Sequence, residues 1–122
     1  MNARVEFSAR FVRALDAMAA HYGEMRGHHP DAGALLDKFL ADLEDEAIPL
    51  LLRQPAIGTR VALHSDGFAD SETLALRIAR AAGRKRVVAR QWRVGPFWLL
   101  YIDIGGCLTL LSARHERQRD YP

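Results

Sequence analysis

Seven residues in the last third of this sequence have side chains of the types that act on a phosphodiester. They are Arg90, Arg93, Trp98, Arg114, His115, Arg117 and Tyr121. Cleavage of RNA needs a base for the 2′-hydroxyl, cationic charge on the pentavalent phosphate and an acid for the leaving oxygen. His115 is suited to either proton transfer, the arginines to the phosphate, and Trp98 or Tyr121 to stacking on a base. The alternative is that His115 and Tyr121 only hold the tail against the rest of the fold.

The stretch that carries these residues predicts three consecutive antiparallel strands. Gly95-Pro96 ends the first strand, and Gly105-Gly106 is typical of a tight hairpin turn, because glycine readily supplies positive φ. The strands are expected at about Arg86–Val94, Phe97–Ile104 and Cys107–Ala113, and the polar tail Arg114–Tyr121 follows them.

The middle strand is apolar on both of its faces. One face carries Phe97, Leu99 and Tyr101, and the other carries Trp98, Leu100, Ile102 and Ile104. A strand of this kind is central in its sheet and has cover on each side. In a chain of 122 residues, help from a partner is one way to provide both covers.

Basic residues gather in the same part of the chain. Residues 1–74 contain 7 basic and 12 acidic residues, net −5, and residues 75–122 contain 10 basic and 3 acidic residues, net +7, which together give the net charge of +2. All but one of the ten are arginine, whose planar fork suits phosphate or carboxylate. This part of the chain is therefore expected to form a face for nucleic acid or for an acidic partner segment. The alternative is a solvated rim along the strand edges.

Composition bounds the class of protein. A length of 122 residues with 26% charged and 49% hydrophobic residues predicts a single globular domain over residues 1–122. We expect no transmembrane helix, because no apolar run reaches eighteen residues, and no secretory signal, because the N-terminus lacks an apolar segment. The one cysteine, Cys107, is interpreted as an inert core thiol and fits a cytoplasmic protein.

A strand and an amphipathic helix are predicted at the N-terminal end. The strand is expected at Ala3–Phe7 with Val5 and Phe7 inward, and Ser8 is a good N-cap for the helix that follows. Two apolar stripes then recur at spacings of three and four: Phe11, Leu15, Met18, Ala19 and Tyr22 in the first helix, and Leu35, Leu36, Phe39, Leu40, Leu43 and Ala47 in a second. The two helices should form a hairpin whose stripes are buried against the sheet.

The helix ends are marked by residues that favour caps and breaks. Gly23 or Gly27 is expected to end the first helix, and Asp31 to cap the second. Pro49 lacks a backbone donor, so we expect it to kink or end the second helix near Ala47.

Residues 59–85 admit two interpretations. Val61–Leu63 fits either a short strand or an ordered loop. Asp70–Gly83 favours a helix by its composition, with Ser71 as cap and Gly83 as stop. The alternation of Leu74, Leu76 and Ile78 with smaller or polar residues would also suit a strand.

Three segments of the sequence carry a resemblance to a known family. The segment Arg93-Val94-Gly95-Pro96-Phe97-Trp98-Leu99-Leu100-Tyr101 resembles the R-V-G-x-Y-R-x-L-Y hairpin of the RelE/ParE toxin superfamily. The segment from Arg114-His115-Glu116-Arg117 to Tyr121 is similar to the H-R-R or H-E-R tail of that family, and Pro55–Gly58 resembles its P-x-x-G element. The resemblance implies an α+β fold in which a helical hairpin packs on one face of a mainly antiparallel sheet. It also implies the toxin of a type II toxin–antitoxin system, with an acidic antitoxin as its partner.

The resemblance leaves two activities open. In the ribonuclease branch, mRNA cleavage at the ribosome relies on basic residues of the sheet and on an Arg or His, often with a Tyr, near the C-terminus. Trp98 stands where that pattern has an arginine, which removes one expected phosphate ligand. The ParE branch is described as poisoning DNA gyrase and has an H-E-R tail, which His115-Glu116-Arg117 matches. The tail residues Arg114, His115, Arg117 and Tyr121 match the ribonuclease set by type and are the expected catalytic residues. Arg90, Arg93 and Trp98 are the expected RNA- or target-binding residues.

Other functional classes are less favoured by the sequence. His21, His28 and His29 lack the further ligands that a metal site needs, and no phosphate-loop motif is found. We therefore expect no metal, no cofactor and no membrane partner. A non-catalytic domain of the same fold, whose basic face only binds an acidic partner or nucleic acid, remains the alternative to a toxin.

Overall fold

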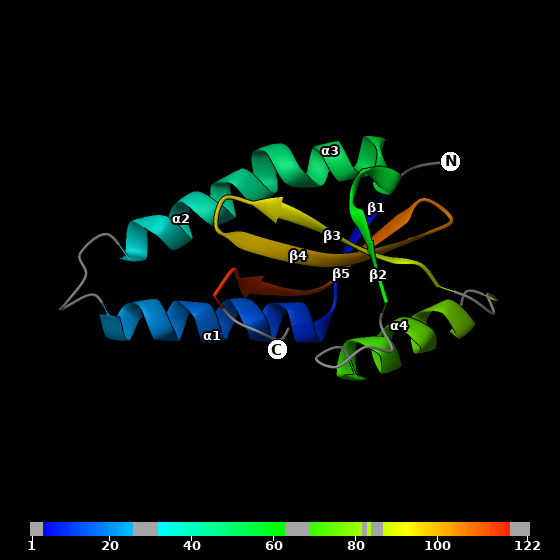
Figure 1. Cartoon of the computed structure of the whole chain (residues 1–122), viewed down its shortest axis with the longest axis horizontal. Helices are drawn as coiled ribbons and strands as arrows, with labels where there is room; N and C mark the ends of the chain where they lie inside the picture. The colour runs from blue at the N-terminus through cyan, green and yellow to red at the C-terminus, as the bar shows by residue number, and fades with distance from the viewer. Residues whose placement is uncertain (1–3, 26–31, 63–68, 82, 84–86, 118–122) are drawn as a thin grey trace.

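Five strands form one sheet in the order β1-β5-β4-β3-β2, and helices cover both of its faces (Figure 1). The computed structural model describes residues 4–25, 32–62, 69–81, 83 and 87–117. β1 runs parallel to β5, and the other neighbouring pairs are antiparallel. The strands are β1 (Arg4–Phe7), β2 (Thr59–Val61), β3 (Ala89–Val94), β4 (Phe97–Ile104) and β5 (Cys107–His115). The expected α+β class with a mainly antiparallel sheet is confirmed.

The hairpins of the C-terminal half follow the predicted pattern. β4 has the predicted bounds, and the turn that follows it has φ of 59° at Gly105 and 85° at Gly106. Both values lie in the left-handed region that favours glycine. β3 begins later than predicted, at Ala89, and β5 is longer than predicted and includes Arg114 and His115. Part of the predicted tail is therefore strand.

The helices are α1 (Ala9–Met25), α2 (Ala32–Asp42), α3 (Ile48–Arg53) and α4 (Ala69–Ala81). Ser8 caps α1 as predicted, since its Oγ accepts the Phe11 N–H at 2.9 Å. The same hydroxyl donates to the Leu111 carbonyl oxygen at 2.9 Å and so fixes the start of α1 to β5. Gly23 lies inside α1 and does not end it. Gly27 and the predicted cap Asp31 lie outside the described residues.

The regular α-helical pattern is interrupted just before Pro49, where the prediction was a kink or an end of the second helix near Ala47. A π-helical turn at Leu43–Ala47 follows α2 directly and leads into α3. In this turn the Ile48 N–H donates to the Leu43 carbonyl, so the hydrogen bonds shift to the i→i+5 pattern. Pro49 then stands in the first turn of α3, where a missing N–H costs little. Pro55–Ile57 forms a short 3₁₀ helix after α3.

Each face of the sheet has its own apolar cluster. On the first face, α1, α2, the π-helical turn and α3 pack against β4 residues Phe97, Leu99 and Tyr101, which confirms the helical hairpin on one face. On the second face, α4 contributes Ala75 to a cluster with Leu100, Ile102 and Leu111. The chain itself therefore supplies cover to both faces of β4, and the partner considered above is not needed for that purpose.

The buried stripes are narrower than predicted. Leu36, Phe39, Leu43 and Ala47 are buried, but Leu35 and Leu40 lie on the outer side of α2, as Ala19 does on α1. Phe7 is 49% exposed rather than inward; it ends the edge strand β1, and its ring lies 5.7 Å from that of Phe11.

The segment that admitted two interpretations is helical. Residues 69–81 form α4, in which Ala75 and Ala79, four positions apart, lie on one side of the helix and are buried, and Ala75 packs against the sheet. Thr59–Val61 forms the short edge strand β2. Among the described helices, none has the length and apolar character needed to cross a bilayer.

Candidate functional site

Three of the predicted site residues form a row across the second face of the sheet. Arg93 on β3 pairs in register with Trp98 on β4, and Trp98 pairs with Arg114 on β5. The guanidinium carbons of Arg93 and Arg114 lie 5.7 Å and 5.9 Å from the centroid of the Trp98 ring, within the range of cation–π attraction. We call these three residues the Arg–Trp–Arg row. It places a cation on each side of a half-buried aromatic ring.

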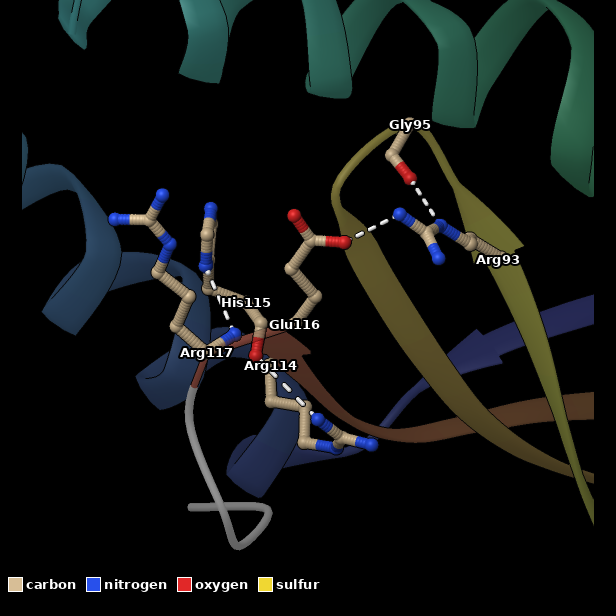
Figure 2. A network of polar contacts seen from close by, with 6 residues as sticks. All are labelled: Arg93, Gly95, Arg114, His115, Glu116 and Arg117. Atoms are coloured by element: carbon tan, nitrogen blue, oxygen red, sulfur yellow. Dashed lines mark hydrogen bonds and ion pairs between the residues drawn. The ribbon is translucent and has the colours of Figure 1, made fainter.

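Arg93 is held in place by the turn and by the tail. Its Nε donates to the Gly95 carbonyl oxygen at 2.8 Å, and its guanidinium forms an ion pair with the carboxylate of Glu116 (Figure 2). The Glu116 N–H donates to the Pro96 carbonyl oxygen at 2.7 Å. Glu116 therefore fixes the tail to the β3–β4 turn and offsets part of the charge of the Arg–Trp–Arg row. Glu116 was not predicted as a site residue, although its place in the segment that resembles an H-E-R tail was a signal.

His115 lies on the first face, opposite the Arg–Trp–Arg row. It pairs in register with Phe97, and the two rings meet edge to face with centroids 5.3 Å apart. Figure 2 shows the Arg114 side chain leaving the strand in the opposite direction from the imidazole, and the Arg114 guanidinium is 3.5 Å from the His115 carbonyl oxygen, a long and weak contact. The predicted catalytic pair of neighbouring residues is thus divided between two faces.

The protonation of His115 is set by its surroundings. The Arg117 N–H donates to Nδ1 at 3.1 Å, which assigns the proton of the neutral ring to Nε2. Burial lowers the pKa of His115, the positive charges of Arg117 and His21 act in the same direction, and Glu116 opposes them. The ring is therefore neutral near pH 7, and its basic nitrogen is already used. In this form it can donate a hydrogen bond from Nε2, but it is not prepared to act as a general base.

A bulge in β5 decides which residue lies on which face. The register passes from Leu100 opposite Ser112 to Tyr101 opposite Leu110, which leaves Leu111 as the extra residue. One extra residue reverses the alternation of side chains beyond it. Accordingly Leu110 and Ala113 both contact the first cluster, three positions apart. If the register of Tyr101 with Leu110 continued without the bulge, Trp98 would pair with Ala113, and Arg114 would pair with Phe97 on the first face.

Arg90 lies apart from Arg93 and takes part in a structural contact. It pairs in register with Tyr101, on the first face, and donates to the Gly58 carbonyl oxygen at 2.9 Å. The Tyr101 hydroxyl donates to the Pro55 carbonyl oxygen at 2.7 Å and accepts the Gly58 N–H at 3.0 Å. Burial raises the pKa of this tyrosine. Arg90 and Arg93 therefore lie on opposite faces of the sheet, and the role of Arg90 in binding RNA or a target stays a prediction.

The remaining predicted residues are placed only in part. Arg117 is exposed just beyond β5, beside His115. Tyr121, His28 and His29 lie outside the described residues. Comparison of this chain with protein-family models, with curated proteins and with solved structures finds no match.

Proposed function

We propose that this chain is the toxin of a type II toxin–antitoxin pair and that it contacts its target through the Arg–Trp–Arg row. The observation that carries the proposal is the row itself, in which two arginines flank a tryptophan across three strands. The resemblance of the β3–β4 hairpin and of the tail to RelE/ParE toxins supports the class. The net charge of +7 over residues 75–122 supports an acidic antitoxin as the partner.

Between the two activities, the geometry favours action by binding, as in the gyrase-poisoning branch. Phosphodiester cleavage needs the proton-transfer group and the cations around one phosphate. Here His115 stands on the face opposite to Arg93 and Arg114, and its Nδ1 already accepts a hydrogen bond. The Arg–Trp–Arg row can bind without an acid or a base.

Inducible expression of the wild-type protein and of two variants tests this proposal. Wild-type expression should arrest growth, and co-expression of an acidic antitoxin from the neighbouring reading frame should restore it. The double variant Arg93→Ala/Arg114→Ala should lose the arrest, because both cations of the row are removed. Arg60→Ala, on the far edge strand β2, removes an exposed arginine elsewhere and serves as the matched control.

His115→Gln separates the two branches. If the protein acts by binding, this variant should keep its toxicity, leave mRNA whole in a translation extract and still cause double-strand breaks in a gyrase assay. If mRNA cleavage is observed and falls by a factor of about 10² to 10⁴ in the variant, as for loss of a general acid or base, the ribonuclease branch holds instead.

A non-catalytic binding domain is the second candidate function. The separation of His115 from the Arg–Trp–Arg row favours it, since the row needs no catalytic group to act as a docking surface. In that case high-level expression of wild-type protein would not affect growth, although an acidic partner would still co-purify. This outcome would reject the toxin proposal and keep the binding surface.

A further inference from the structure

A cleft of about 390 Å³ lies between the start of α1 and the middle of α4. Figure 1 shows the start of α1 beside α4, and the two helices share the lining of this cleft. Its volume lies in the range of clefts that hold small ligands. The residues that line it are Ala9, Arg10, Arg13, Thr73, Leu74 and Arg77.

Three of these six residues are arginines, and they come from two helices. Arg10 and Arg13 are three positions apart on α1, and Thr73 and Arg77 are four positions apart on α4, so each pair lies on one side of its helix. Within the part of the chain that the structure describes, Arg13 and Arg77 form no ion pair. Positive charges gathered around one cleft repel one another, and an anion bound there would relieve the repulsion.

The start of α1 adds a further positive field. Ala9, the first residue of this 17-residue helix, lines the cleft, and the first turn of α1 contains no acidic residue. The positive end of the helix dipole therefore faces the cleft without a carboxylate of its own turn to offset it. Leu74 and Ala9 supply apolar surface next to these charges.

We propose that this cleft binds a ligand that carries phosphate, with phosphoryl oxygens on the guanidinium groups of Arg13 and Arg77. The planar fork of arginine matches two phosphate oxygens at once. The cleft shares no residue with the Arg–Trp–Arg row, so the inference does not depend on the toxin proposal. The same phosphate chemistry is found in free phosphate compounds and in the backbone of a nucleic acid.

Calorimetric titration of the purified full-length chain tests this inference and separates the two sources. The probes are pyrophosphate, adenosine diphosphate and a short single-stranded oligouridine. Arg13→Ala and Arg77→Ala should each weaken binding roughly tenfold to a hundredfold, as expected for the loss of a hydrogen bond to a charged group. Arg80→Ala removes an arginine one turn further along α4, outside the lining, and should change affinity by less than about threefold, because a separated surface charge is largely screened.

Each outcome decides the inference. If pyrophosphate or adenosine diphosphate binds, and Arg77→Ala weakens that binding, the ligand is a free phosphate compound. If only the oligouridine binds, and Arg77→Ala weakens its binding, the ligand is a nucleic-acid backbone. The variant Arg77→Glu, with a far-ultraviolet circular dichroism spectrum like that of wild type, should abolish either. If no probe binds, or if Arg13→Ala and Arg77→Ala bind as tightly as Arg80→Ala, the cleft is not a phosphate site.

Discussion

The two faces of the sheet differ sharply at the end where β3, β4 and the tail meet. The second face carries the Arg–Trp–Arg row, in which cations flank an aromatic ring. The first face carries a neutral imidazole whose ring meets that of Phe97. Arg114 and His115 belong to different faces because adjacent residues of a strand point to opposite sides of the sheet. The comparison teaches that strand alternation divides this motif into a surface suited to binding and a contact suited to packing, and that one extra residue earlier in the strand decides which residue takes which face.

The largest expected effect on the free energy of unfolding comes from replacing Phe97, and its neighbour Trp98 on the opposite face provides the comparison. Phe97 is fully buried and contacts the rings of Phe39 and His115. Phe97→Ala should therefore lower the free energy of unfolding by about 3–5 kcal/mol. Trp98→Ala should cost less, because Trp98 is half-buried and each cation–π contact contributes only about 0.5–1 kcal/mol near the surface. Urea denaturation of both variants measures the difference, and equal costs would contradict the contrast between the two faces.

The second prediction concerns the pH dependence of stability. Burial lowers the pKa of His115 in the folded chain, so the unfolded chain takes up its proton at a higher pH, near the ordinary value of about 6.5. As the pH falls through this value, the free energy of unfolding should decrease, and it should recover as the pH rises again. Urea denaturation at a series of pH values measures this slope.

His115→Gln provides the control for that slope. The variant lacks the titrating ring, so its stability should change less with pH over the same window than that of wild type. An unchanged slope would mean that another group causes the pH dependence and that His115 is not held neutral by its surroundings.

The smallest expected effect on stability concerns Arg93 and Glu116. Both side chains are exposed, by 51% and 39%, and exposed ion pairs contribute only about 0–1 kcal/mol. Glu116→Gln should therefore change the free energy of unfolding by no more than about this amount. It should, however, free the charge of Arg93 and increase toxicity in the growth assay, whereas Arg93→Ala should decrease it. If the two variants changed toxicity in the same direction, Glu116 would contact the target itself and not only balance Arg93.

Local patterns predicted much of the fold. Three features follow from short stretches of sequence. The apolar run predicts β4, the need for positive φ predicts the Gly105-Gly106 turn, and a side-chain acceptor predicts the Ser8 cap. The helix over 69–81 follows from composition in the same way. The π-helical turn that accommodates Pro49 was not predicted, because the shift in its hydrogen bonds has no short sequence pattern that marks it.

The candidate site was predicted by residue type but not by arrangement. Arg93, Trp98 and Arg114 do come together, because β-strand register places them opposite one another. His115 and Arg90 do not join them. The bulge at Leu111 depends on how β5 packs on β4, and the bond from Arg90 to Gly58 depends on a turn 32 positions away. The sequence contained one sign of the contacts around Gly58. Tyr101 lies in an apolar strand, and a buried tyrosine hydroxyl needs a hydrogen-bond partner.

The parallel pairing of β1 with β5 has a consequence for the order in which the chain folds. Ser8 and Leu111 are 103 positions apart, whereas β3, β4 and β5 are joined by tight turns. Local hairpins close quickly and distant pairings slowly, so β1, although it precedes the other strands of the sheet in the chain, should be the last to enter the sheet. Until β5 is made, β1 has no partner strand beside which to lie. Substitutions at this seam should therefore speed unfolding while leaving the folding rate almost unchanged.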